Sequence, residues 1–190
     1  MVTRDSDKRE AILNAALELF AEYGFYGTPI PLIAERAHVG AGTIYRYFES
    51  KEALGNAVYQ RAKEMLYDVL NQDFPEDLPV REQFHVFWQR ITKFAIENPQ
   101  TFQFLELHSH ESYLDKTSRT VELKVWEPGL TFFEMTCQRK ITKPLPLKIL
   151  VAIVWGMFVG VTKAGQRGHY SLDEDLFNKV EQICWEAIRY

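Results

Sequence analysis

Apolar residues recur along this chain at the three- and four-residue spacing of amphipathic α-helices, and no stretch alternates apolar and polar residues convincingly as a half-buried strand does. The first apolar stripe is formed by Leu13, Ala16, Leu17 and Phe20. It predicts a helix from Asp7 to Tyr23. Asp7 and Glu10 are spaced as a capping box, and Gly24 is placed as the left-handed residue that ends the helix. Because the helical spacing continues beyond this segment, the fold is predicted to be all-α.

Two short helices are predicted next. Thr28 is placed to cap the first of them, and Pro29 stands in its first turn, where a missing N–H costs nothing. The apolar stripe of this helix is Ile30, Ile33, Ala34 and Ala37. A tight break then precedes a third helix at 43–48. In that helix Ile44 and Phe48 lie four residues apart and are predicted to pack inward.

The third helix directs a polar face outward. This face consists of Thr43, Tyr45, Arg46 and Tyr47. Hydroxyls and a guanidinium on so short a helix suit the phosphates and base edges of DNA better than they suit a core. With the helix and tight turn before it, the segment 29–48 predicts a helix-turn-helix. Taken singly, each of these side chains is as compatible with an ordinary solvated position.

A long fourth helix is predicted from Ser50, its cap, to Asn71. Its apolar positions are Leu54, Val58, Ala62, Met65 and Leu66. Two prolines and three acidic residues over 71–79 then mark the clearest boundary in the chain. We therefore expect two domains, at 1–70 and 71–190.

Helical patterns continue beyond the boundary. The apolar faces are Phe84, Phe87, Trp88, Ile91, Phe94 and Ala95, then Phe102 and Leu105 after Pro99, then Leu123, Trp126, Leu130 and Phe133. The longest apolar run, Ile149 to Val161, has 13 residues. A membrane span needs about 18, so this run is expected to be buried in protein, and no membrane partner is expected.

Composition agrees with a globular chain. The 190 residues are 46% apolar and 25% charged and include 13 Phe, 9 Tyr and 4 Trp, so a sizeable core is expected. Two cysteines, Cys137 and Cys184, can build neither a disulfide framework nor a zinc finger. The first residues mix acids with bases and lead into no apolar core, unlike a secretory signal. A reducing, cytoplasmic location is expected.

Net charge does not favour a nucleic-acid partner. The chain carries a formal charge of −4, and residues 1–50 hold five Lys and Arg against seven Asp and Glu. Any binding to DNA must therefore depend on the local placement of a few groups rather than on bulk attraction.

The helix-turn-helix segment and its flanks carry a specific set of residues. They are Gly24, Phe25, Thr28, Ile30, Ile33, Ala34, Ala37, Val39, Gly42, Thr43, Ile44, Tyr45, Tyr47, Phe48, Ser50, Lys51, Glu52, Ala53 and Leu54. From Asp7 to Leu70 the chain thus resembles the N-terminal domain of TetR/AcrR-type transcriptional regulators. The resemblance implies that the third helix enters the major groove of duplex DNA. It implies base contacts from Ala41, Gly42, Tyr45 and Arg46, and phosphate contacts from Thr28, Thr43, Tyr47 and Lys51.

Two positions depart from the family pattern. Pro29 stands where a polar residue that reaches the DNA is usual, and this removes one base reader. His38 stands where glycine is common, and histidine tolerates positive φ better than most residues.

The resemblance also implies about nine helices, with a small-molecule effector bound in the C-terminal domain. Ten aromatic residues between Arg81 and Met135 favour a largely apolar cavity, although aromatic residues at helical spacing are more often plain core. The candidate ligand-binding residues are Phe84, Trp88, Phe102, Leu105, His108, Trp126 and Phe133.

The run from His108 to Glu111 contains two imidazoles and a carboxylate, which are metal ligands. On a helix the side chains of His108 and His110 point about 200° apart, so they could share an ion only if the helix has ended. No metal and no cofactor are expected, while a metal at this cluster stays an open alternative.

The run Ile149 to Val161 is apolar on all sides, so both faces of its helix need cover. The last helix has an apolar stripe of its own at Leu176, Val180, Ile183, Ala187 and Ile188. The resemblance implies a homodimer that buries two helices from each chain. The candidate interface residues are Trp155, Gly156, Phe158, Gly160, Ile183 and Ala187. A central core helix of a monomer is the alternative.

The function predicted from these features is DNA-binding transcriptional regulation. We expect a repressor that a small, largely apolar effector releases from a palindromic operator. A small helical enzyme is one alternative, but the chain has no GxSxG elbow and no Gly-rich phosphate loop, so no enzyme is expected. An architectural DNA-binding protein that senses no effector is the other.

Overall fold

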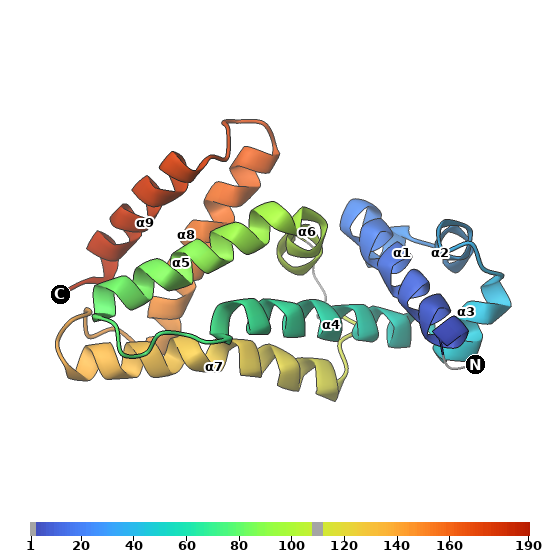
Figure 1. The fold of residues 1–190 in the computed structure, drawn as a ribbon, viewed down its shortest axis with the longest axis horizontal. Helices are drawn as coiled ribbons and strands as arrows, with labels where there is room; N and C mark the ends of the chain where they lie inside the picture. The colour runs from blue at the N-terminus through green and yellow to red at the C-terminus, as the bar shows by residue number, and fades with distance from the viewer. Residues whose placement is uncertain (1–2, 108–111) are drawn as a thin grey trace. The chain divides into compact units, whose positions relative to one another are not determined.

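The computed structural model describes residues 3–107 and 112–190. Within these ranges the chain forms nine α-helices and no strand, apart from an isolated bridge between Thr142 and Arg189. The helices are α1 (Thr3–Gly27), α2 (Ile30–Arg36), α3 (Ala41–Tyr47), α4 (Lys51–Asn71), α5 (Val80–Glu97), α6 (Pro99–Leu107), α7 (Lys116–Gln138), α8 (Leu147–Gln166) and α9 (Glu174–Ile188) (Figure 1). The predicted all-α fold is confirmed.

The helices pack into two compact units. Unit 1 is Met1–Met65 with Glu97–Glu122, and unit 2 is Leu66–Ile96 with Leu123–Tyr190. The residues of α4 and of α7 are thus divided between the two units. The two domains expected from the sequence are continuous segments, whereas each of these units combines two separate segments that pack together. The expected division into domains therefore stays a prediction.

The core of unit 1 forms where α1 packs on α2 and α6. Every residue of the stripe predicted for α2 is buried, and on α1 Leu13, Ala16 and Phe20 are buried as well. The Phe20 ring lies 5.4 Å from the ring of Phe25 and 6.2 Å from that of Phe104. Aromatic pairs at these spacings add to the energy of area burial and hold α6 against α1.

Helix α1 is longer at both ends than predicted. It is already helical at Thr3, so Asp7 lies inside the helix, and the predicted capping box is wrong. Gly24 adopts φ 74° and ψ 167°, a positive φ as predicted, but helical structure resumes beyond it to Gly27. Gly24 is therefore a kink rather than the end of the helix.

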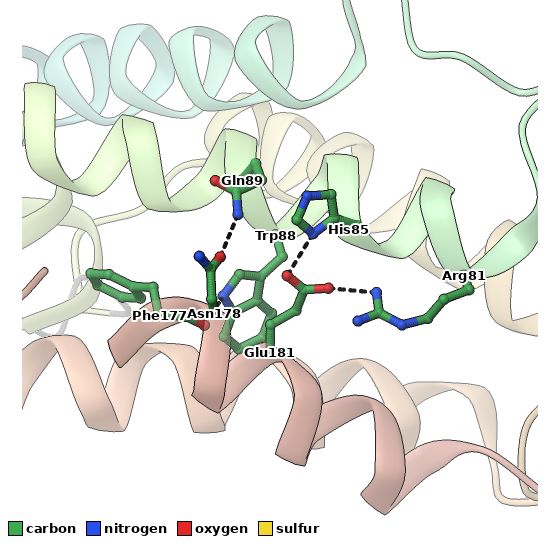
Figure 2. A network of polar contacts seen from close by, with 7 residues as sticks. All are labelled: Arg81, His85, Trp88, Gln89, Phe177, Asn178 and Glu181. Atoms are coloured by element: carbon green, nitrogen blue, oxygen red, sulfur yellow. Dashed lines mark hydrogen bonds and ion pairs between the residues drawn. The ribbon is translucent and has the colours of Figure 1, made fainter. Parts of the chain in front are cut away.

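The core of unit 2 is built around Trp88 of α5, which is fully buried. Its indole Nε1 donates to the backbone oxygen of Phe177 at 2.9 Å (Figure 2). Its ring also meets that of Phe158 edge-on at 5.4 Å. Phe158 and Phe177 also stack at 5.5 Å. One indole therefore joins α5, α8 and α9.

Polar contacts hold α5 to α9 beside this core. The buried carboxylate of Glu181 accepts from the guanidinium of Arg81 and lies 2.7 Å from Nδ1 of His85 (Figure 2). Gln89 donates to the side chain of Asn178 at 2.8 Å. Because both oxygens of the carboxylate are engaged, the burial of Glu181 is compensated.

Two apolar positions do not face inward as predicted. Leu123 of α7 is 69% exposed, because the buried face of the helix passes through Val125, two residues or about 200° away. Met65 of α4 is exposed as well.

Candidate nucleic-acid interface and regulatory residues

Helix α3 is held by two buried side chains. Ile44 is fully buried and Phe48, the C-cap residue, is nearly so, as predicted. Their burial leaves the opposite side of the helix in solvent, where Tyr45 is 54% exposed and Arg46 is exposed. Thr43 and Tyr47 are half-exposed, and Ala41 and Gly42 at the start of the helix are exposed. Ile44 and Phe48 thus face inward and Tyr45 and Arg46 face solvent, as predicted.

The turn between α2 and α3 depends on His38. This residue adopts φ 54°, which confirms the tolerance of positive φ expected for it. The N–H of His38 donates to the carbonyl of Glu35, and that of Val39 to the carbonyl of Ala34 at 2.9 Å. These bonds close the end of α2 and bring α3 back against it, which is the geometry of a helix-turn-helix.

The cation of α3 lies beside an aromatic ring. The guanidinium carbon of Arg46 is 5.2 Å from the ring centroid of Tyr47, and Nη2 donates to the Tyr47 hydroxyl at 3.3 Å. Arg46 and Tyr47 therefore present a cation and a hydroxyl together at the end of α3.

Lys51, in the first turn of α4, is also seated on an aromatic ring. Its ammonium lies 4.5 Å from the centroid of Phe25, and partial burial lowers the pKa of Lys51 below its ordinary value. The Ser50 hydroxyl accepts from the N–H of Ala53 at 3.1 Å, so Ser50 caps α4 as predicted.

Thr28 has a different role from the predicted one. The N-cap of α2 is Pro29, with no side-chain cap, and the Thr28 hydroxyl donates instead to the carbonyls of Leu19 at 3.1 Å and Gly24 at 2.8 Å. The side chain is fully buried. Because the hydroxyl is enclosed and donates to these backbone carbonyls, it is not presented to a phosphate, and the expected contact is corrected on this ground.

Comparison with known families matches nearly the whole chain. Residues 12–58 match the bacterial regulatory proteins of the tetR family, and residues 59–190 match the tetracyclin repressor-like C-terminal domain. The chain belongs to the TetR family. It is accordingly a DNA-binding transcriptional regulator of the helix-turn-helix type, and such proteins are generally not enzymes.

Similar proteins come from several bacteria. An uncharacterised HTH-type transcriptional regulator of Haemophilus influenzae is 24% identical over 184 residues, which is 97% of each chain. A TetR-family protein structure from Vibrio parahaemolyticus has 27% identity and a TM-score of 0.78, and covers 96% of this chain and 99% of its own. Another, from Marinobacter aquaeolei, has 23% identity and a TM-score of 0.87, and covers 100% and 99%.

The residues predicted to bind an effector in this TetR-family protein are divided between the two units. Phe84, Trp88, Trp126 and Phe133 belong to unit 2, whereas Phe102 and Leu105 belong to the core of unit 1. His108, with the rest of the suspected metal cluster, lies outside the described residues. Trp88 is sealed into the core by α8 and α9, whereas the half-exposed Trp126 meets the ring of Trp155 edge-on at 5.5 Å.

Helix α8 has one buried and one open face. The buried face is Leu150, Val154, Phe158 and Thr162. The Phe158 ring is buried against Trp88 and Phe177, so it cannot contact a second chain. The expectation that Phe158 lies in the dimer interface is therefore corrected. By length and composition alone α8 could cross a membrane, a property it shares with core helices of soluble proteins.

The open faces of α8 and α9 carry most of the other predicted interface residues. Gly156 and Gly160 are exposed on α8, and Ile183, at 61% exposure, and Ala187 are exposed on α9. Trp155 is half-buried. The stripe predicted for α9 was partly wrong, since its buried face includes Phe177, Cys184 and Trp185.

One polar cluster was missed in the sequence. Helix α4 carries four polar residues that are buried or half-buried within unit 1: Asn56, Tyr59, Gln60 and Lys63. Their spacing of three, four and seven residues would have identified them as one face, but polar side chains at that spacing are usually solvated. Among the residues that the structure describes, no three His, Cys, Asp or Glu side chains gather as a metal site.

Proposed function

We propose that this TetR-family protein is a homodimeric repressor that binds a near-palindromic operator and is released by a small, largely apolar effector. The observation that carries the proposal is the outward face of α3, where Tyr45 and Arg46 are exposed above two buried anchors. In a two-fold dimer, two copies of α3 lie in successive major grooves about one helical turn apart, which requires an operator of matching symmetry.

Each exposed group on α3 has a chemical role in this proposal. Tyr45 and Arg46 read base edges, since a hydroxyl and a guanidinium are donors suited to the acceptors of the major groove. Thr43, Tyr47 and Lys51 contact phosphates and set the register without reading sequence. Because the chain is acidic overall, these few groups supply the specificity, and long-range attraction supplies little.

The dimer of this proposal is formed by α8 and α9. Ile149, Gly156 and Gly160 on α8 and Ile183 and Ala187 on α9 are exposed small or apolar residues on two adjacent helices. Burying such a surface against a second chain is favourable. The two glycines let a second helix approach closely, because nothing lies within 4 Å of a Cβ built on either. Two helices from each chain then make a four-helix interface.

The effector acts by stabilising a second conformation in which α4 has changed its orientation, so that the two copies of α3 no longer match the operator. Trp126 and Trp155, both half-exposed, support an aromatic-lined site in unit 2. Both cysteines are free, in keeping with action on DNA in the reducing cytoplasm.

The test is selection of bound sequences from random duplex DNA, followed by sedimentation of the free protein. We expect a near-palindromic consensus and a species of twice the 22.2 kDa chain mass. Gly160→Glu should shift the mass toward one chain, whereas Gln138→Glu, at an exposed position outside α8 and α9, should not. A stable wild-type monomer at micromolar concentration, or no enrichment of any sequence, would contradict the proposal.

A further inference from the structure

The first turns of α1 lie beside the end of α3 (Figure 1). The guanidinium carbon of Arg9 on α1 is 5.4 Å from the ring centroid of Phe48, the C-cap residue of α3. Phe48 directly follows Tyr47 and precedes Lys51 by three residues, and both of these residues are proposed to contact phosphates. Arg9 therefore brings a positive charge from a different helix to the end of α3 where the proposed phosphate contacts lie.

The contacts of Arg9 leave its N–H groups accessible to a ligand. The guanidinium lies over the ring of Phe48, and such a cation–π contact uses no N–H donor. Oε1 of Glu10 lies 3.7 Å from Nη1 of Arg9, which is too long for a hydrogen bond. The side chain of Arg9 is 48% exposed, so its donors face water, which a phosphate can replace.

The acidic residue next to Arg9 is held by a different cation. Oε2 of Glu10 accepts from Nη1 of Arg61 on α4 at 2.8 Å, and this bond joins α1 to α4 within unit 1. Two cations and one anion give the three side chains a net charge of +1. Because Glu10 is hydrogen-bonded to Arg61, this positive charge is located mainly at Arg9, beside the end of α3.

We propose that Arg9 binds a phosphate of the DNA backbone, in addition to the contacts made by the helix-turn-helix. This inference rests on the proposed function, since it adds α1 to the DNA-binding surface. A guanidinium suits the role because its N–H donors match the oxygens of a phosphate. The contact with Phe48 orders the guanidinium before DNA binds, so less conformational entropy is lost on binding. A phosphate carries no sequence information, so Arg9 strengthens binding without reading bases.

The test measures the affinity of Arg9→Met for duplex DNA over a salt series. Methionine keeps an apolar side chain against Phe48 and removes the charge. We expect affinity to fall about threefold to tenfold on operator and scrambled duplexes alike, and the slope of log affinity against log salt to shrink by about 1 for each arginine lost. Arg119→Met, at an exposed arginine of α7 in the same unit, should change neither. Wild-type affinity and slope in Arg9→Met overturn the proposal.

Two further measurements separate a phosphate contact from a structural contact between α1 and α3. Arg9→Lys keeps the charge and should recover most of the salt slope, because the slope counts neutralised phosphates. If Arg9 only held α1 on α3, Arg9→Met would lower the melting temperature and leave the slope unchanged. If Arg9→Met does not fold, Arg9→Gln removes the same charge and replaces it.

Operator duplexes ethylated at single phosphates locate the contact directly. In each half-site, ethylation at one position should weaken binding of the wild type but not of Arg9→Met, because the contact made there is already lost. The same pattern of interference in both proteins would refute the assignment.

Binding to a random duplex distinguishes this inference from the proposed function. If the wild-type chain selects an operator but Arg9→Met keeps the wild-type slope, only the phosphate contact is wrong. If the wild type enriches no sequence, the proposed operator is wrong, while the salt series on the random duplex still decides whether Arg9 contacts a phosphate. A chain that binds no duplex at any salt concentration contradicts both.

Discussion

Helices α3 and α8 each bury one face within their own unit and leave the other uncovered, but the uncovered faces differ in chemistry. On α3 the exposed groups are the hydroxyl of Tyr45 and the guanidinium of Arg46, which water solvates well. On α8 they include Ile149, Ala152 and two glycines, which offer water little to hydrogen-bond with. Exposure of α3 therefore costs the free protein little, whereas exposure of α8 favours a partner that stays bound.

The difference teaches how each surface can be recognised. The apolar face of α8 indicates a binding surface by its chemistry alone, because burying exposed apolar residues against a partner is favourable in any protein. A polar helix face indicates no such surface, because most helices have one. The face of α3 is assigned to DNA because it follows a tight turn and because the segment matches the family. Substitutions on the buried and open sides of both helices should separate these two kinds of surface.

The largest expected effect is on the buried side of α8. Phe158→Ala removes a ring packed between Trp88 and Phe177 and should lower the free energy of unfolding by about 3 to 5 kcal/mol. Leu123→Ala, at an exposed position of the same unit, should change it by about 0.5 kcal/mol or less. Urea unfolding followed by circular dichroism measures both. Equal losses would mean that Phe158 is not the core residue described above.

The buried side of α3 should respond next. Ile44→Ala should cost about 2 to 5 kcal/mol of stability, because Ile44 is fully buried on a helix with few other anchors. Operator affinity should fall with it, and thermal unfolding should show the loss even in the absence of DNA. A variant as stable as wild type would show that α3 is not held by this side chain.

The open side of α3 should show the opposite pattern. Tyr45→Ala should leave stability unchanged but weaken binding to the selected operator by about 1 to 3 kcal/mol and relax the base preference. Tyr23→Ala removes an equally exposed tyrosine from α1 and serves as the control. Fluorescence anisotropy with operator and scrambled duplexes gives both affinities. Wild-type affinity in Tyr45→Ala would remove this residue from the interface.

Much of this arrangement was predictable, and the failures have physical causes. The inward direction of Ile44 and Phe48 follows from spacing alone, and the cap at Ser50 from residue type. The role of Thr28 could not be predicted, because its acceptors include Leu19, nine residues away, whose carbonyl is within reach only once α1 has folded and kinked.

The packing of the predicted ligand and dimer residues was harder to predict for a related reason. Spacing shows that Phe158 and Ile183 are on apolar stripes, but not which side of the stripe faces the chain's own core. The aromatic positions Phe102 and Trp88 likewise belong to different units, a division that sequence order does not reveal. Lys63 was missed because a lysine is normally solvated.

A smaller effect is expected at the edge of the proposed interface. Lys51→Ala should weaken binding to all duplexes alike and reduce the slope of log affinity against log salt by about 1, since one phosphate contact is lost. Lys116→Ala provides the exposed control in the same unit. Affinities over a salt series measure the slope. A slope unchanged from wild type would mean that Lys51 contacts no phosphate.

The smallest effect concerns the thiols. Burial, and to a lesser degree Glu181, raises the pKa of Cys184 to about 12, so at neutral pH the thiol stays protonated and enclosed. Iodoacetamide should therefore add one group to the native chain, at the partly exposed Cys137, and a second only after unfolding. Mass spectrometry of both samples counts the adducts, and two in the native protein would contradict this account.

The ring of Phe25 has one further consequence. One of its neighbours is the ammonium of Lys51, and another is the ring of Tyr113, stacked on it at 4.0 Å; a Cβ at Gly55 would lie 2.9 Å from it. Substitutions at Tyr113 or Gly55 should therefore move the Phe25 ring, and with it the ammonium of Lys51, which is proposed to contact a phosphate. Natural variation at such interior positions can therefore change the affinity for DNA in small steps without changing the residues of α3 that face outward.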